Sequence, residues 1–282
     1  MVIAVTDIRL WLRYAYAFYF LVLALLIGVE VAGFVGMGAQ RWISLGFFNV
    51  QPSELMKVAM VLALARYFHG GSIEDVGRMM FLAPPAIMVA IPAVLIIRQP
   101  DLGTTLMLGL ASVAMFFAAG VRMWKFILAG ILGLISAPVA WFTILRDYQK
   151  QRILTFLNPE TDTLGSGYHI IQSKIALGSG GMFGKGFMQG TQSHLNFLPE
   201  KQTDFIFTML AEEFGLVGGL TLIALYILLL AYGFVISMSS RNHFGRLVGI
   251  GVTVTFFLYI FINIAMVMGL IPVVGVPLPL VS

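Results

Sequence analysis

Asp204 is the residue whose type and position most directly suggest chemistry. It ends the polar string Pro-Glu-Lys-Gln-Thr-Asp at residues 199–204, and a long apolar run begins at Phe205. A carboxylate at the top of an apolar helix can meet a substrate at the membrane boundary, and acidic groups at membrane depth tend to be functional. The same residue can simply cap the helix, because Asp and Thr side chains satisfy the free amides of a first helical turn. The local pattern leaves both interpretations open.

A second group of chemically capable residues lies in the string Gln-Pro-Ser-Glu-Leu-Met-Lys at residues 51–57. Pro52 suits the first turn of a helix. Glu54 and Lys57 are three residues apart, so they share one helical face and can pair. They form either a self-neutralised pair, which lets a membrane helix carry two charges, or the polar wall of a cavity.

A third string, Gln-Pro-Asp-Leu-Gly-Thr-Thr at residues 99–105, starts another apolar helix with a carboxylate, Asp101. Capping is again the plainer interpretation. Gly103 would let a neighbouring helix approach closely. Two helices therefore present an aspartate at one of their ends.

The elements that position these residues are membrane-spanning helices. The chain has 282 residues, of which 59% are hydrophobic and only 11% charged, whereas about a quarter of a soluble domain is charged. Several runs reach the roughly 20 apolar residues that cross a bilayer, so we expect an all-α, polytopic helical membrane protein. Seven full spans are predicted, and residues 1–8 form part of an earlier one. The seven lie at about 13–35, 52–68, 79–97, 102–120, 124–145, 205–236 and 246–270.

The distribution of Lys and Arg predicts the topology, because cytoplasmic loops are enriched in them. Four short connections carry two basic residues each, and the connections on the opposite side carry fewer. The richer set is Arg9 and Arg13, Arg66 and Arg78, Arg122 and Lys125, and Arg241 and Arg246. These connections are expected in the cytoplasm, so the three strings above and the long loop at about 146–204 share the extracytoplasmic side.

Other classes of protein are excluded or disfavoured by composition. The chain contains no cysteine, so it has no disulfide and no thiol chemistry. The basic residues are dispersed and form no stripe, which speaks against nucleic acid; the net charge of +4 suits anionic membrane lipids.

Several further features are expected to serve the same extracytoplasmic site. Residues 168–177 predict a short amphipathic helix, and the glycines of 178–186 allow either close backbone approach to a ligand or a hinge. Glu212 and Glu213 are expected at the membrane interface, and Glu30 and Asn263 in hydrogen bonds between helices. The apolar but irregular residues 271–282 are expected to line the outer pocket, because non-helical backbone at membrane depth needs protein or a cavity against it.

Taken together, these strings closely resemble the SEDS family (shape, elongation, division and sporulation), most of all its rod-shape branch. The resemblance runs nearly from end to end. The strings that carry it are 39–43 (Ala-Gln-Arg-Trp-Ile), 51–54 (Gln-Pro-Ser-Glu), 99–104 (Gln-Pro-Asp-Leu-Gly-Thr), 167–174 (Gly-Tyr-His-Ile-Ile-Gln-Ser-Lys), 199–207 (Pro-Glu-Lys-Gln-Thr-Asp-Phe-Ile-Phe) and 272–279 (Pro-Val-Val-Gly-Val-Pro-Leu-Pro).

The resemblance implies one membrane domain over residues 1–282, from a ten-span family whose first span and last helix this chain lacks. It implies a peptidoglycan polymerase in the bacterial inner membrane that joins lipid II units on the extracytoplasmic face for cell elongation and rod shape. Its implied partners are lipid II, a class B penicillin-binding protein, elongation-complex proteins and membrane lipids, and not nucleic acid. In that family the aspartate of the Thr-Asp-Phe string is the proposed catalytic residue, here Asp204, and Trp42, Lys57 and Asp101 match positions in or near the cavity.

The reaction implied by the resemblance joins an α-linked diphosphate donor into a β-linked product. Such an inversion needs one general base, expected to be Asp204, and cations that neutralise the leaving group, with or without a divalent Mg or Mn ion. The expected substrate-binding residues are Arg41, Trp42, Gln51, Glu54, Lys57, Asp101, Lys174, Glu200, Lys201 and Thr203. Two other functions remain open: a lipid II flippase, and a non-catalytic scaffold or activator of the transpeptidase.

Overall fold

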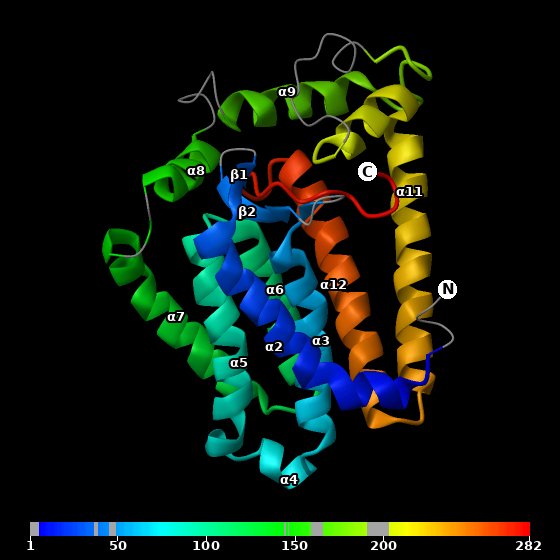
Figure 1. The fold of residues 1–282 in the computed structure, drawn as a ribbon. Coiled ribbons are helices and arrows are strands. Elements are labelled where there is room, and N and C mark those ends of the chain that lie inside the picture. Colours follow the sequence, from blue (N-terminus) through cyan, green and yellow to red (C-terminus); the bar gives the residue numbers. More distant parts are fainter. Residues whose placement is uncertain are drawn as a thin grey trace. The chain divides into compact units, whose positions relative to one another are not determined.

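The computed structural model describes residues 6–36, 39–44, 49–143, 145, 147–158, 166–190 and 203–282. Glu200 and Lys201, two of the predicted site residues, lie outside the described residues. The described chain is mainly helical (Figure 1), as the sequence predicts. It divides into two compact units: the first holds Met1–Met123 with Ala231–Thr255, and the second holds Trp124–Leu230 with Phe256–Ser282.

The first unit is built around α3. Its elements, in chain order, are α2 (Ile8–Ala32), β1 (Phe34–Gly36), β2 (Ala39–Ser44), β3 (Asn49–Val50), α3 (Pro52–His69), α4 (Ile73–Val76), α5 (Met79–Arg98) and α6 (Leu102–Ala118). Helix α3 packs against α2, α5 and α6. Fully buried side chains from these helices, among them Tyr19, Met56, Leu64, Met107 and Met115, form its core.

Local sequence signals explain where these helices begin and end. Asp7 caps α2 by accepting a hydrogen bond from the Arg9 amide at 2.9 Å. Helix α3 has Pro52 at its first position and ends at Gly70, which follows the usual placement of proline and glycine at helix ends.

A small antiparallel sheet between α2 and α3 was not predicted. Its strand order is β1-β2-β3, with Trp42 of β2 opposite Phe34 and Ile43 opposite Val50. Strands this short give no alternating run long enough to recognise in a sequence. The sheet positions Arg41 and Trp42, so it bears on the site.

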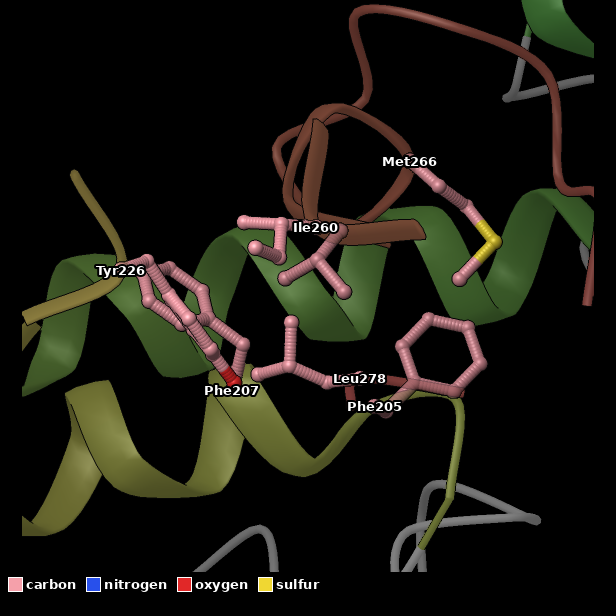
Figure 2. Packing of buried hydrophobic residues seen from close by; sticks show 7 residues of the cluster. Phe205, Phe207, Tyr226, Ile260, Met266 and Leu278 are labelled. Carbon is pink, nitrogen blue, oxygen red and sulfur yellow. The ribbon is translucent and has the colours of Figure 1, made fainter. Parts of the chain in front are cut away.

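The second unit contains α7 (Met123–Thr143), α8 (Asp147–Leu157), α9 (Ser166–Ser179), most of α11 (Ile206–Ser239) and the second half of α12 (His243–Val267). Its hydrophobic core joins α11, α12 and the C-terminal segment, as Figure 2 shows for Phe205, Tyr226, Ile260, Met266 and Leu278. Helix α11 is kinked at Gly215, where φ is 67°. Phe205, the residue after Asp204, is therefore anchored in a packed core.

All seven predicted spans are helices in the structure. Five of them are long and apolar enough to cross a membrane: Ile8–Val31, Met79–Arg98, Met123–Thr143, Ile206–Ser239 and His243–Val267. Helix α6 has 17 residues, and α3 carries three charged residues, Glu54, Lys57 and Arg66. The protein is a multi-pass membrane protein, and its charged helix α3 is packed among α2, α5 and α6.

Candidate active site

Asp101 is the centre of a polar cluster in the first unit. Its carboxylate accepts hydrogen bonds from the amide and the hydroxyl of Thr104, at 3.1 and 2.9 Å, so it does cap α6. Gln51 Nε2 donates to the same carboxylate at 3.3 Å, and Arg41 Nη1 lies 3.9 Å from it. Asp101 is only 6% exposed, so these partners take the place of water around its carboxylate. The cluster ties β2 and the start of α3 to the start of α6.

Arg41 makes further contacts to the same turn. Its Nε donates to the Gln99 carbonyl at 3.2 Å, and its Nη2 donates to the Pro100 carbonyl. The next residue on β2, Trp42, is half-buried. The structure thus brings Arg41, Gln51 and Asp101 together, as predicted, and gives Arg41 a role in holding the turn before α6.

Glu54 and Lys57 form the ion pair that their spacing predicts. Lys57 Nζ lies 2.8 Å from Glu54 Oε1, and the Lys57 side chain is 2% exposed against 43% for Glu54. A buried lysine needs such a partner, since an uncompensated charge at this depth is costly. The pair confirms the first interpretation, self-neutralisation, and the cavity wall stays a prediction.

In the second unit, Asp204 lies in a turn that immediately precedes α11. The carboxamide of Asn263 fixes the backbone of this turn. Its Nδ2 donates to the Asp204 carbonyl at 2.8 Å and to the Val276 carbonyl at 2.7 Å, and Asn263 is fully buried. One amide nitrogen carries two protons and can serve both carbonyls. Asn263 was predicted to bond between helices; its partners are instead this turn and the C-terminal segment.

The C-terminal segment, residues 271–282, is held against the Asp204 turn at several points. Ser282 Oγ donates to the Thr203 carbonyl at 3.0 Å, and Tyr226 Oη donates to the Pro279 carbonyl at 2.6 Å. The segment is non-helical, as predicted, and its polar backbone is partly satisfied by these side chains. Thr203 and Asp204 are both half-buried, so the carboxylate is partly open to its surroundings.

Gly275 makes room for the Asp204 carboxylate. Its φ is 75°, and a Cβ added there would lie 3.3 Å from Asp204 Oδ2. Glycine is the residue that adopts this backbone conformation without strain. The tight approach places the backbone of the C-terminal segment directly beside the candidate base.

Replacing Gly275 with alanine is therefore expected to reduce activity by about 10- to 100-fold, because small displacements of a catalytic group cost this much. Left-handed strain adds about 1 kcal/mol of destabilisation. Gly133→Ala is the matched control, since Gly133 lies within α7 with nothing within 4 Å of an added Cβ. Turnover of lipid-linked substrate by both variants checks the prediction, which equal rates would contradict.

Among the described cations of the unit that holds Asp204, two contact residues that follow α12. Lys174, a predicted site residue, is exposed on α9 and packs its side chain against Gly269. Arg152 of α8 was not predicted, and its Nη1 donates to the Val273 carbonyl at 3.5 Å, two residues from Gly275. The sequence analysis did not predict α8, the helix that carries Arg152. A single arginine in a long polar loop does not by itself indicate a binding site.

Helix α9 confirms the helix predicted at residues 168–177. It is attached to its neighbours by buried hydroxyls: Ser173 Oγ lies 2.9 Å from Thr208 Oγ1 and donates to the Val267 carbonyl at 2.8 Å. Helix α9, which carries Lys174, is thereby fixed to the first turn of α11, next to Asp204.

The glycines after α9 approach protein backbone. A Cβ on Gly180 or Gly184 would collide with the backbone of Ala211 or Glu213, so only glycine allows this contact. The loop is also joined to α11 by an ion pair between Lys185 Nζ and Glu212 Oε1 at 2.7 Å. Glu212, expected at the interface, has no exposed surface. The sequence predicted neither this burial nor its partner, because Lys185 comes from a segment distant in sequence, and the level of Glu212 at the membrane interface stays a prediction.

The described residues of each unit offer few protein ligands for a metal ion. Within those residues, no group of three or more His, Asp or Glu side chains is placed to hold a metal. Mg²⁺ is often bound by one or two carboxylates together with substrate phosphates and water. Asp204 fits this mode of binding as a single carboxylate ligand. The described residues do not form a metal site made of protein ligands alone.

Comparison with known proteins finds relatives along the whole chain. The model of the FtsW/RodA/SpoVE cell cycle proteins matches residues 1–282. The peptidoglycan glycosyltransferase MrdB of Escherichia coli K12 is 45% identical over 287 residues, which cover all of this chain and 76% of MrdB. Stage V sporulation protein E of Bacillus subtilis is 40% identical over 94% of this chain and 71% of its own length.

Two solved structures share the fold. One, described as the structural coordination of polymerization and crosslinking by a peptidoglycan synthase complex, superimposes with a TM-score of 0.83 at 30% identity, covering 100% of this chain and 78% of that one. The rod shape determining protein RodA of Thermus thermophilus gives a TM-score of 0.69 at 28% identity, over 98% of this chain and 73% of that one. Sequence and structure agree along the whole length, and the chain belongs to the FtsW/RodA/SpoVE cell cycle protein family, the SEDS family that its motifs resemble.

Proposed function

We propose that this protein is a peptidoglycan glycosyltransferase that joins the disaccharide units of lipid II into β-1,4 glycan strands for cell elongation and rod shape. The observation that carries the proposal is the 45% identity, over the entire chain, to a relative named peptidoglycan glycosyltransferase. The structural likeness to a peptidoglycan synthase complex supports it independently.

In the proposed reaction, Asp204 removes the proton from the acceptor sugar hydroxyl. The hydroxyl oxygen then forms a bond to the anomeric carbon of the donor, while the bond from that carbon to the diphosphate oxygen breaks. The diphosphate leaves with the bonding electron pair as undecaprenyl pyrophosphate, and the α linkage becomes β. One carboxylate suffices because diphosphate is a good leaving group, unlike the two carboxylates of inverting hydrolases.

The second unit supports this role for Asp204. A general base must be held in place, and the backbone of Asp204 is fixed by Asn263 while Gly275 admits its carboxylate. Leaving-group charge needs cations, for which Arg152 and Lys174 are the candidates of this unit. Lys174 was predicted from the sequence, and Arg152 is added by the structure.

The first unit is proposed to carry its own set of substrate-binding residues: Arg41, Trp42, Gln51, Glu54, Lys57 and Asp101. Arg41, Gln51 and Asp101 are bonded to one another or to the same turn. Substituting any of them would therefore also disturb the start of α6, and lost activity alone would not identify a substrate contact. Lys57 is buried and already paired with Glu54, so a phosphate would have to compete with that carboxylate for its ammonium group.

A divalent cation, Mg or Mn, is proposed to accompany the diphosphate. When bound, it would neutralise charge on the leaving oxygens. Asp204 is the side chain that fits as a protein ligand, and the protein's own contribution is to hold that carboxylate in place.

The proposed setting is the bacterial inner membrane, with the Asp204 end of α11 extracytoplasmic. The asymmetry of basic residues supports this orientation. The partners proposed are a class B penicillin-binding protein and other elongation-complex proteins, since one structural relative comes from a complex that couples polymerization to crosslinking.

A polymerisation assay on the purified protein in liposomes tests the proposal, using fluorescent lipid II with and without a class B penicillin-binding protein. Glycan strands are expected, and a chelator such as EDTA should reduce their yield and added Mg²⁺ or Mn²⁺ restore it. Movement of lipid II across the bilayer without polymer would instead indicate a flippase. Absence of polymer under every condition, from protein that still binds the partner, would indicate a scaffold.

A further inference from the structure

We propose that residues 182–188, here named the apolar loop, insert into the bilayer interface beside α11. The apolar side chains of this loop are Met182, Phe183, Phe187 and Met188. The proposal depends on the membrane character of the protein and is independent of the reaction. It assigns a lipid-facing surface to a loop that the sequence suggests is a polar connection.

The first argument is the depth at which the loop is attached. The backbone of this loop and of Gly181 is hydrogen-bonded to the kink of α11: the amides of Leu216 and Val217 donate to the carbonyls of Gly181 and Met182, at 2.9 and 3.2 Å. In return, the amides of Lys185 and Gly186 donate to the carbonyls of Glu212 and Glu213, both at 3.0 Å. The loop is therefore fixed at the level of Gly215, the centre of these contacts.

Gly215 also marks one boundary of the hydrocarbon core. Residues 215–236 are 22 residues of α11 without a charged side chain, and Glu212 and Glu213 precede them. At 1.5 Å per residue this run is about 33 Å long, close to the ~30 Å thickness of the hydrocarbon core. A loop attached at its first residue lies where hydrocarbon gives way to headgroups.

The second argument is the character of the exposed side chains. Met182, Phe183, Phe187 and Met188 are between 59% and 82% exposed. A cluster of exposed large apolar side chains indicates a contact surface. Aromatic residues are enriched at this depth of a membrane.

The surface of the loop continues into the apolar surface of α11. Phe187 contacts Phe214, with ring centroids 6.2 Å apart. Phe214, Leu216 and Val217 are themselves exposed on the helix. Lys185, the charged residue within the loop, is paired with buried Glu212, with its Nζ 2.7 Å from Glu212 Oε1. Its charge therefore does not interrupt the exposed apolar side chains of the loop. This continuity with a spanning helix favours lipid as the occupant.

The absence of cysteine from the chain makes a clean test available. Phe183→Cys and Met188→Cys are each labelled with a nitroxide and reconstituted into vesicles of phosphatidylethanolamine and phosphatidylglycerol. Electron paramagnetic resonance then measures collision with oxygen, which concentrates in lipid, and with a water-soluble nickel chelate. Leu225→Cys, exposed within the apolar run of α11, reports lipid, and Glu74→Cys, exposed in α4, reports water.

Both loop labels are expected to favour oxygen over nickel, with a depth between those of the two controls. A ratio equal to that of Glu74→Cys would mean that the loop lies in water, and would overturn the proposal. Low collision with both reagents would mean that protein covers the loop, and would also overturn it. Two loop positions are used so that one misfolded variant does not decide the result, and neither readout requires glycan synthesis.

Discussion

Replacing Asp204 with asparagine is expected to lower glycan polymerisation from purified lipid II by about 10² to 10⁴-fold, the contribution typical of a general base. The substitution keeps the size of the side chain. It also leaves in place the backbone carbonyl of residue 204, which accepts a hydrogen bond from Asn263 at 2.8 Å. The turn before α11 should therefore keep its conformation. Membrane insertion and the thermal unfolding midpoint are expected to stay close to those of the parent protein.

Asp147→Asn is the matched control for this experiment. Asp147 begins α8 in the same unit, and its side chain is fully exposed, with Lys150 Nζ 3.9 Å away. The same chemical change there should leave polymerisation nearly unchanged. Normal glycan synthesis by Asp204→Asn, alongside normal synthesis by the control, would remove Asp204 from the mechanism.

Replacing Lys185 with methionine is expected to destabilise the protein by about 3 kcal/mol, as is typical when one member of a buried ion pair is removed. Glu212 has no exposed surface, so the substitution removes the cation 2.7 Å from a carboxylate that water cannot reach. The free energy of unfolding, measured by titration with a denaturing detergent, checks this expectation.

The reciprocal substitution, Glu212→Gln, is expected to cost less. Lys185 keeps 29% exposure of its side chain, so its ammonium can be hydrated once the carboxylate is gone. The double variant should be more stable than Lys185→Met alone, because it leaves no buried charge behind. If the two single variants lost equal amounts of unfolding free energy, the proposed asymmetry between a buried and a half-exposed partner would be contradicted.

Much of the fold follows from short-range patterns in the sequence. Apolar runs of bilayer length predict each spanning helix, because a backbone in lipid must satisfy its own hydrogen bonds. Asp101 at the start of an apolar run predicts a capped helix start, and the spacing of Glu54 and Lys57 predicts their pair. These relations span less than two helical turns, so no tertiary knowledge is needed to see them.

The environment of the candidate base was not predictable in the same way. Asn263 is 59 residues from Asp204 in the chain, and Gly275 is 12 residues further on. Their types are compatible with many other partners: an asparagine in an apolar run suggested a bond between helices, and Gly275 lay in a segment expected to be irregular. The fold brings them to one carboxylate, and a Cβ at Gly275 would make a tight contact of 3.3 Å with Asp204 Oδ2.

Asp204 itself shows the division between the two sources of information. Local sequence patterns place a carboxylate at the head of a membrane helix, and its motif resembles that of a family of glycan-synthesising proteins. The folded structure adds the groups that hold this carboxylate, the cations of its unit and the lysine that allows Glu212 to be buried. Helices in lipid form from local hydrogen bonds, whereas a site forms from contacts between residues distant in the chain.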